Sequence, residues 1–239
     1  MPAKALVPLG GEAMLSRVAR ALIDYPGIGR IIVLTQDAAL LTGRADTAWL
    51  ADHRAINFET GGDSVSAAVV AAVERHPGGY PFLVVTADHA LLDAAMLKAF
   101  ILPAVAAAAD IAVALVERKV LEARYPGNRR TWLKFRGGAY SGANLFLLES
   151  PRALRALALW QSVEQQRKKG RAIVAAFGPL ILAGVALRLL SLRGALRLAG
   201  KRLGLTAVAV PLPMPEACID VDKVEDHALA SEILARRGG

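Results

Sequence analysis

The sequence predicts an α/β fold of the Rossmann-like kind, with a mainly parallel sheet and helices on both faces. Short apolar runs rich in β-branched residues alternate along the chain with longer segments of helical periodicity. Hydrophobic residues make up 54% of the 239 residues, which is enough for a sizeable core in one domain spanning 1–239. No internal repeat, heptad array or low-complexity tract interrupts the alternation.

The first half of the chain alternates between helix and strand patterns. In chain order, the sequence predicts a helix at 11–25, a strand at 30–35, a helix at 63–76, a strand at 81–88 and a helix at 93–108. Asp63 or Ser64 is expected at the N-cap of the second helix. Pro103 is expected to kink or break the third helix.

The second half continues this pattern after one pair of adjacent strands. In chain order, the sequence predicts a strand at 110–117, a strand pair at 131–136 and 142–148, a helix at 151–168, a strand at 206–212 and a helix at 225–236. The Gly-rich run GGAYSG is expected to be the loop that joins the strand pair.

The balance of charges limits the classes of partner. A formal net charge of +8 favours anionic partners such as nucleotides, phosphorylated metabolites, nucleic acid or anionic lipid headgroups. The single cysteine, Cys218, allows no internal disulfide and is typical of a cytoplasmic protein. The longest uncharged stretch, 172–187, would span about 24 Å as a helix, against ~30 Å for a bilayer core. A transmembrane span is therefore not expected.

Two regions carry much of the positive charge. Residues 117–136 contain seven Lys or Arg and two Glu, and this insertion between core strands is suited to an anionic acceptor. Residues 167–202 contain nine Lys or Arg and no acid, and a basic amphipathic helical segment is expected over 167–203. Two interpretations of this segment stay open: a core-packed helix with a solvated basic face, or an interfacial helix in peripheral contact with an anionic membrane.

One carboxylate follows a core strand directly. Asp88 ends the run FLVVTAD, at the carboxyl end of a strand, where ligands of open α/β sheets bind. A carboxylate there can face a cation instead of hydrocarbon. The alternative is a helix cap or an ordinary loop acid before the next helix.

Four stretches in a fixed order together point to a family. They are KALVPLGGEAMLSRV at 4–18, GGDSVSAAVVAAV at 61–73, VVTADHALLDAAML at 84–97 and CIDVDKVEDHALASEIL at 218–234. In this order and spacing the chain resembles MobA-like nucleotidyltransferases, whose fold is that of the nucleotide-diphospho-sugar transferases. The run YSGANLFLL at 140–148 is similar to the family's strand near the acceptor site.

The resemblance implies a magnesium-dependent enzyme that transfers NMP from an NTP to a phosphorylated small-molecule acceptor and releases pyrophosphate. Mg²⁺ is held by one or two carboxylates together with phosphate oxygens and waters. Asp88 and Asp222 are the expected ligands, with Asp220 as the substitute for the second. Lys4 is the expected phosphate ligand and shares the catalytic role with Asp88. The alternatives are a solvated turn for the two later acids and an exposed terminal lysine.

The remaining expected contacts involve small residues. The resemblance implies that the backbone turns close to the nucleotide at Gly10 and Gly11, and that the base and ribose contact the element containing Gly61, Gly62 and Ser64. It places Gly142 and Asn144 at the acceptor pocket. Ordinary turns, a helix cap and an edge strand are the alternatives. No nucleic acid partner is expected.

The family pattern has one part that this sequence lacks. A strand and a Gly-rich loop of the form A-A-G-x-G-x-R precede the lysine segment in the family, and neither is found before Lys4. We expect a start codon assigned too late or a fragment, with a gap or displaced pairing between the strands at 30–35 and 81–86. A non-catalytic relative that serves as a binding module, and a nucleotide-sugar glycosyltransferase at a membrane, are the alternative functions.

Overall fold

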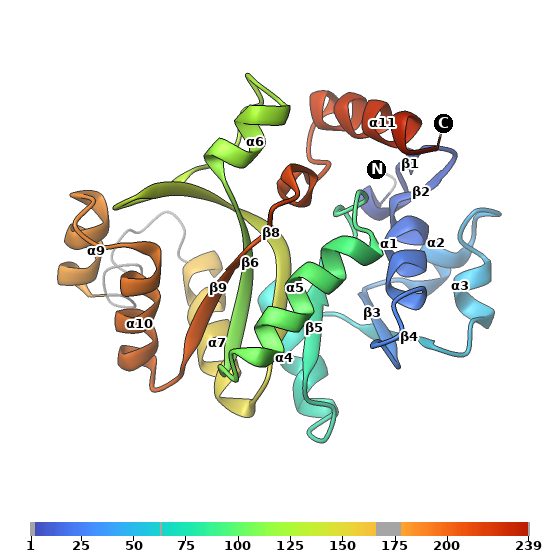
Figure 1. Ribbon diagram of the computed structural model, residues 1–239. Helices are drawn as coiled ribbons and strands as arrows, with labels where there is room; N and C mark the ends of the chain where they lie inside the picture. The colour runs from blue at the N-terminus through green and yellow to red at the C-terminus, as the bar shows by residue number, and fades with distance from the viewer. Residues whose placement is uncertain (1–2, 63, 166–177, 239) are drawn as a thin grey trace.

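The computed structural model describes residues 3–62, 64–165 and 178–238 (Figure 1). Its α/β class confirms the sequence prediction, and its sheet is mixed. The elements of the N-terminal part are η1 (Lys4–Leu6), β1 (Pro8–Leu9), β2 (Glu12–Ala13), α1 (Met14–Ile23), β3 (Ile31–Thr35), α2 (Ala38–Thr42), α3 (Trp49–Asp52), β4 (Ile56–Thr60) and α4 (Val65–Arg75).

The rest of the chain builds the larger sheet and its helices. Its elements are β5 (Phe82–Val85), α5 (Ala94–Ala106), β6 (Ile111–Glu117), α6 (Arg118–Arg124), β7 (Leu133–Phe135), β8 (Gly138–Leu148), η2 (Pro151–Ala153), α7 (Leu154–Gln165), α9 (Pro179–Ala186), α10 (Leu192–Leu203), β9 (Ala207–Pro211), η3 (Pro215–Cys218) and α11 (Val224–Gly238).

The larger sheet is mixed because of one long strand. Its order is β5-β8-β6-β9, with β7 also paired to β8. β8 runs antiparallel to β5, β6 and β7, whereas β6 and β9 are parallel. The sequence pattern leads one to expect a mainly parallel sheet, because strand and helix alternation does not reveal that β8 returns between β5 and β6.

The sheet is divided between β3 and β5. Within the described residues, β3 pairs in parallel with β4 alone, and β5 pairs with β8 alone. The gap in pairing expected between these two strands is thus present. All four residues of β5 are apolar, yet each of them stays partly exposed beside this gap.

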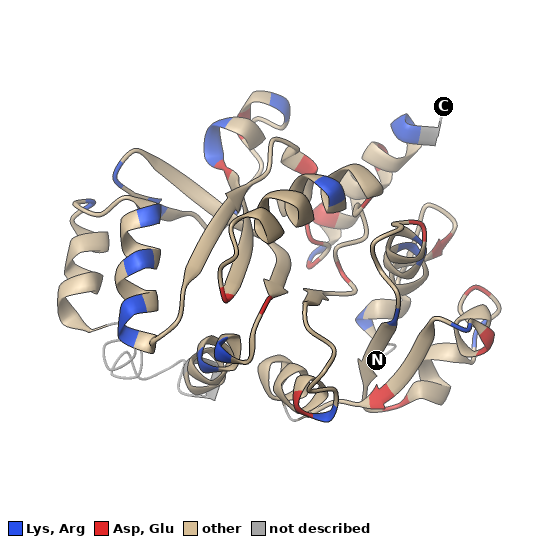
Figure 2. Ribbon diagram, turned by 60° about the horizontal axis from the view of Figure 1, so that its bottom comes forward, with Lys and Arg blue, Asp and Glu red and all other residues tan. Residues whose placement is uncertain are grey.

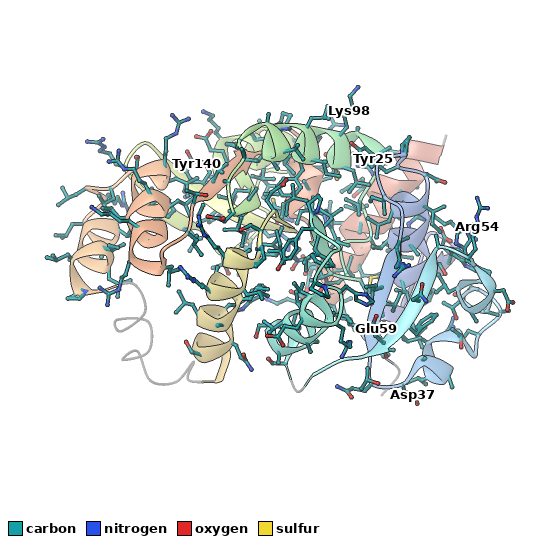
Figure 3. The ribbon with its side chains drawn as sticks, turned by 90° about the horizontal axis from the view of Figure 1, so that it is seen from below. Tyr25, Asp37, Arg54, Glu59, Lys98 and Tyr140 are labelled. Atoms are coloured by element: carbon teal, nitrogen blue, oxygen red, sulfur yellow. The ribbon has the colours of Figure 1, made fainter. Side chains whose placement is uncertain are left out.

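Successive residues of the central strands enter two separate cores. On β6, Ile111 belongs to the cluster formed with α4 and α7, and Ala112 to the larger cluster formed with α5. On β8, Leu148 belongs to the cluster with α4 and α7, and Leu147 to the cluster with α5. This alternation is the two-residue period of a strand. It places α5 on one face of the sheet and α4 with α7 on the other, as the view from below shows (Figure 3).

Two local expectations need correction. The run GGAYSG lies largely within β8 instead of a loop, because the hairpin turns at Arg136 and Gly137. Gly137 has φ +94°, which suits a two-residue hairpin turn. Helix α5 continues through Pro103 to Ala106, so the proline lies in its last turn and does not break it.

The expected basic helical segment consists of two helices in the part that the structure describes, and 167–177 lie outside the described residues. Arg188 lies in the turn between α9 and α10, with φ +56°. Helix α10 packs beside β9, with Ala195 buried, which is the core-packed interpretation. Helix α9 has no buried residue. No helix among the described residues is long and apolar enough to cross a membrane.

The core around α5 supplies a direct test of this packing. Phe100 is fully buried, whereas Leu102 on the same helix is 54% exposed. We expect Phe100→Ala to lower the free energy of unfolding by about 3–5 kcal/mol, because it leaves a cavity between α5 and the sheet. Leu102→Ala is the matched control and should change it by less than about 1 kcal/mol. Equal losses in urea unfolding would contradict the assigned packing of α5.

Candidate functional site

Three carboxylates from two distant segments meet beyond the end of β5. One oxygen from each of Asp88, Asp220 and Asp222 lies within 4.8 Å of the others. A backbone hydrogen bond of 3.1 Å from the amide of Val221 to the carbonyl of Asp88 ties the two segments together. The expected proximity of Asp88 to both later acids is therefore observed. Their role as metal ligands stays a prediction.

The Lys4 ammonium lies between two of these acids. Its Nζ donates to Asp88 Oδ2 and to Asp222 Oδ1. The short helix η1 holds Lys4 there, with Leu6 buried beneath it. Partial burial alone would lower the pKa of Lys4, but the hydrogen bonds to Asp222 and Asp88 outweigh it and raise this pKa above its usual value. Lys4 is therefore charged at neutral pH.

The two later acids differ in their environment. The hydrogen bond from Lys4 lowers the pKa of Asp222 below its usual value. Burial raises the pKa of Asp220, although the nearby Arg130 guanidinium acts in the opposite direction. A divalent cation would favour the ionised form of both.

Arg130 contacts the acid cluster, although the sequence analysis did not single it out. Its side chain is only 8% exposed and donates to Asp220 Oδ1 at 2.6 Å and to Asp226 Oδ1 at 2.8 Å. This arginine of the basic insertion thus faces the acid cluster instead of solvent. The run NRR shows in the sequence that this segment is positively charged. Only the tertiary structure shows that Arg130, and not Arg129, contacts the acids.

Asp226 connects the cluster to the final helix. Its Oδ2 accepts from the amides of Asp222 at 3.3 Å and Lys223 at 3.1 Å, at the start of α11. It therefore caps the helix and orients the backbone of Asp222 at once. Asp226 makes these capping contacts, whereas Asp220 and Asp222 accept from Arg130 and Lys4.

Asn144 reaches the cluster through an irregularity in β8. The pairing with β6 shifts register between Val113 and Leu115, and Asn144 has φ +50°. Such a bulge redirects a side chain. The amide Nδ2 of Asn144 lies 3.5 Å from Asp220 Oδ2. Gly142 stays in the strand, opposite Leu115, and its acceptor role is a prediction.

The remaining predicted residues lie in a hairpin turn, in a loop and at a helix N-cap. Gly10 and Gly11, at φ +60° and +91°, form the turn of the β1–β2 hairpin, and this turn requires such angles. Gly61 and Gly62 accept hydrogen bonds from Gln36 through their carbonyls. Ser64 caps α4 by accepting from the amide of Ala67. The structure does not join these residues to the acid cluster through any hydrogen bond among the described residues.

The donor set fits a hard divalent cation. Each of the three acids offers carboxylate oxygen, the ligand type that Mg²⁺ prefers, and the spacing of these oxygens suits one shared ion. Two cationic side chains, Lys4 and Arg130, complete the charge pattern. The arrangement can therefore hold a cation and a polyanionic ligand at one place.

The chain is similar to known transferases in sequence and in structure. A family described as the MobA-like NTP transferase domain matches residues 2–180, a range that contains Lys4 and Asp88. A hypothetical transferase from Thermus thermophilus is 28% identical with a TM-score of 0.75, over 94% of this chain and 90% of that one. No curated protein matches the chain significantly.

More distant structures share the fold. A 4-diphosphocytidyl-2C-methyl-D-erythritol synthase has 13% identity and a TM-score of 0.60, over 97% of this chain and 94% of that one. A CMP:2-keto-3-deoxy-manno-octonic acid synthetase complexed with CTP has 12% identity and a TM-score of 0.60, over 99% and 93%. The expected nucleotide-diphospho-sugar transferase-like fold is thus confirmed.

His89 makes stability depend on pH. Its ring is buried, neither ring nitrogen has a hydrogen-bond partner among the described residues, and burial lowers its pKa to about 4. Asp88 and Asp93 oppose this shift, and Arg237 adds to it. Below about pH 6.5 the unfolded chain binds a proton that folded His89 does not, so stability falls with falling pH. We expect a loss of about 2 kcal/mol between about pH 7 and pH 5.

Urea unfolding at several pH values measures this loss. His89→Leu should flatten the dependence between about pH 7 and pH 5, because the substituted side chain cannot bind a proton. An unchanged slope in the variant would assign the dependence to other groups.

Arg130 should be needed for stability as well as for the shape of the cluster. We expect Arg130→Ala to lower the free energy of unfolding by about 3 kcal/mol, because it leaves Asp220 and Asp226 without their buried partner. The matched control is Arg129→Ala, at an exposed position beside it, which should change stability by less than about 0.5 kcal/mol. Similar unfolding midpoints for the two variants would contradict the buried network.

Proposed function

Since this chain belongs to the MobA-like NTP transferase domain family, we propose that it transfers NMP from an NTP to a phosphorylated small-molecule acceptor and releases pyrophosphate. The observation that carries the proposal is the cluster of Asp88, Asp220 and Asp222 around the Lys4 ammonium. Reactions of this kind need positioned charge more than a covalent protein nucleophile.

The reaction itself is an in-line displacement. A phosphate oxygen of the acceptor attacks the α-phosphorus of the NTP, and the bond from the α-phosphorus to the bridging oxygen breaks as pyrophosphate leaves. Asp88 and Asp222 would hold a Mg²⁺ ion, with Asp220 in support. Such an ion would supply positive charge to the phosphates during the displacement.

Lys4 has a second role in this proposal. Its ammonium contacts Asp88 and Asp222. The same ammonium sits at the end of a long and flexible stem, so it can turn from these carboxylates to a phosphate oxygen of the NTP. Lys4 would thus both hold the acids together and contact the phosphates of the substrate.

Other residues would position the two substrates. Arg130 fixes Asp220, and Asn144 lies against the same carboxylate, so both can orient the acceptor side. The backbone at Gly10 and Gly11 and the element with Gly61, Gly62 and Ser64 would bind the nucleotide. CTP is the first nucleotide to test, because one structure of this fold is complexed with CTP.

Two measurements test the proposal separately. Thermal shift with each NTP should show stabilisation that requires Mg²⁺, and a pyrophosphate assay with phosphorylated acceptors should show release. We expect Asp88→Asn to weaken both, with turnover reduced by about 10²-fold or more, because the carboxylate charge is lost from the metal site. The matched control is Asp24→Asn at an exposed acid after α1, which should leave both unchanged.

Each result has a distinct meaning. Nucleotide binding without pyrophosphate release would favour the non-catalytic binding module. If Asp88→Asn and Asp24→Asn had equal effects on NTP binding and on pyrophosphate release, the acid cluster would not be the active site. Lys4→Ala should weaken NTP binding more than metal binding, since its partner in the complex is phosphate.

A further inference from the structure

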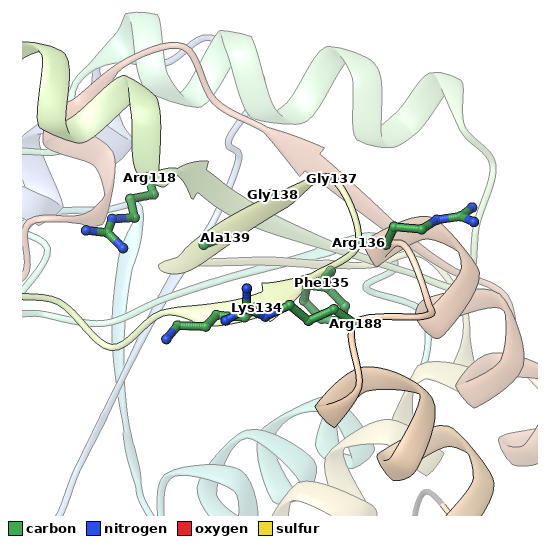
Figure 4. A pocket seen from close by; sticks show the side chains of 8 residues that line it. All are labelled: Arg118, Lys134, Phe135, Arg136, Gly137, Gly138, Ala139 and Arg188. Atoms are coloured by element: carbon green, nitrogen blue, oxygen red, sulfur yellow. The ribbon is translucent and has the colours of Figure 1, made fainter.

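The two basic regions of the sequence meet at one end of the molecule. A hollow of about 500 Å³ is lined by four cationic side chains, Arg118, Lys134, Arg136 and Arg188 (Figure 4). The first three belong to the basic insertion and the fourth to the later basic region. The amide of Arg136 donates to the carbonyl of Leu190 at 2.8 Å, and this bond joins the two regions.

Little negative charge balances these cations. Arg118 pairs with Glu122 at 2.7 Å. Within the described part of the chain, Lys134, Arg136 and Arg188 form no ion pair with a carboxylate, and no acid lines the hollow. Cations gathered in a hollow with little counter-charge attract anionic groups.

An exposed apolar helix lies beside the hollow. Helix α9 carries no charged residue and packs against β7 and α10 only along part of its surface. Leu180 is 86% exposed, and Leu187 and Leu189 after the helix are 67% and 63% exposed. Leu133 of β7 is also more than half exposed. These leucines come from α9, from the turn after it and from β7, which contacts α9, and exposed apolar residues on adjoining elements can mark an interaction site.

The neighbouring helix extends the positive charge. Arg193, Arg197 and Lys201 are exposed and recur every four residues along α10, where they form a basic stripe (Figure 2). The sequence contains no acidic residue from 165 to 215. This end of the molecule therefore combines apolar side chains with an excess of positive charge.

We propose that this end, formed by the hollow, α9 and the α10 stripe, docks on an anionic phospholipid bilayer. The exposed leucines would enter the boundary between headgroups and acyl chains, and the cations would contact lipid phosphates. A second copy of the chain is a poor occupant, because it would bring two cationic surfaces together. The proposal rests on none of the residues of the acid cluster and is independent of the proposed reaction.

The division of the basic region supports the same assignment. Helix α10 packs against β9 with Ala195 buried, whereas α9 has no buried residue and leaves Leu180 in solvent. The interfacial interpretation of the basic segment therefore applies to α9 and the turn after it, and the core-packed interpretation applies to α10.

Vesicle flotation with the intact chain tests this docking. We expect the protein to float with mixed phosphatidylglycerol and phosphatidylcholine vesicles at low salt, to float poorly with phosphatidylcholine alone, and to be released by added salt. Lys134→Gln with Arg136→Gln should weaken binding by about tenfold to thirtyfold. Leu180→Ser with Leu187→Ser should weaken it by about tenfold or more.

A matched control removes the same charge elsewhere. Arg54→Gln with Lys98→Gln neutralises two exposed cations on other parts of the molecule (Figure 3) and should change vesicle binding by less than about threefold. Absence of flotation with anionic vesicles at low salt would overturn the proposal, as would equal losses in the control and in the hollow variant. Sedimentation velocity completes the test: a dimer that the leucine substitutions convert to monomer would assign this surface to self-association instead.

Discussion

Three carboxylates can lie together beyond β5 because two cations hold them there. Lys4 joins Asp88 to Asp222, and Arg130 joins Asp220 to Asp226. These contacts connect the N-terminal segment, the end of β5, the basic insertion and α11. Without the cations, repulsion among the acids would open the site, since like charges at this spacing disfavour each other's ionised form. Much of the tertiary arrangement around the site therefore depends on this charge balance.

The same balance links stability to the proposed chemistry. A buried ion pair is weak evidence for stability, but removal of one partner is costly, since the other charge remains in a poor solvent. Lys4 is the more exposed of the two cations and can exchange partners, whereas Arg130 is nearly enclosed. Arg130 can therefore keep Asp220 in place when Lys4 changes partner.

The cationic side chains of the basic insertion lie in two different environments. Arg130 forms ion pairs with Asp220 and Asp226. In contrast, Lys134, Arg136 and Arg188 line a hollow beside the exposed helix α9. The chain thus has two cationic regions with different environments, one balanced by carboxylates and one open to solvent. The proposed reaction involves the first region, and the proposed docking on a bilayer involves the second.

The sequence by itself determined the α/β class, most helices and strands of the larger sheet, and the pairing of Asp88 with the acids near 220. These features depend on local periodicity and on ordered motifs, which a sequence displays directly. Tertiary structure alone decided the antiparallel course of β8, the bulge that turns Asn144 toward Asp220, and the choice of Arg130 over Arg129. It also decided that two separate basic regions meet at one hollow. Each of these depends on strand register or long-range pairing, whose energy comes from contacts between residues far apart in the chain, and no local pattern records such contacts.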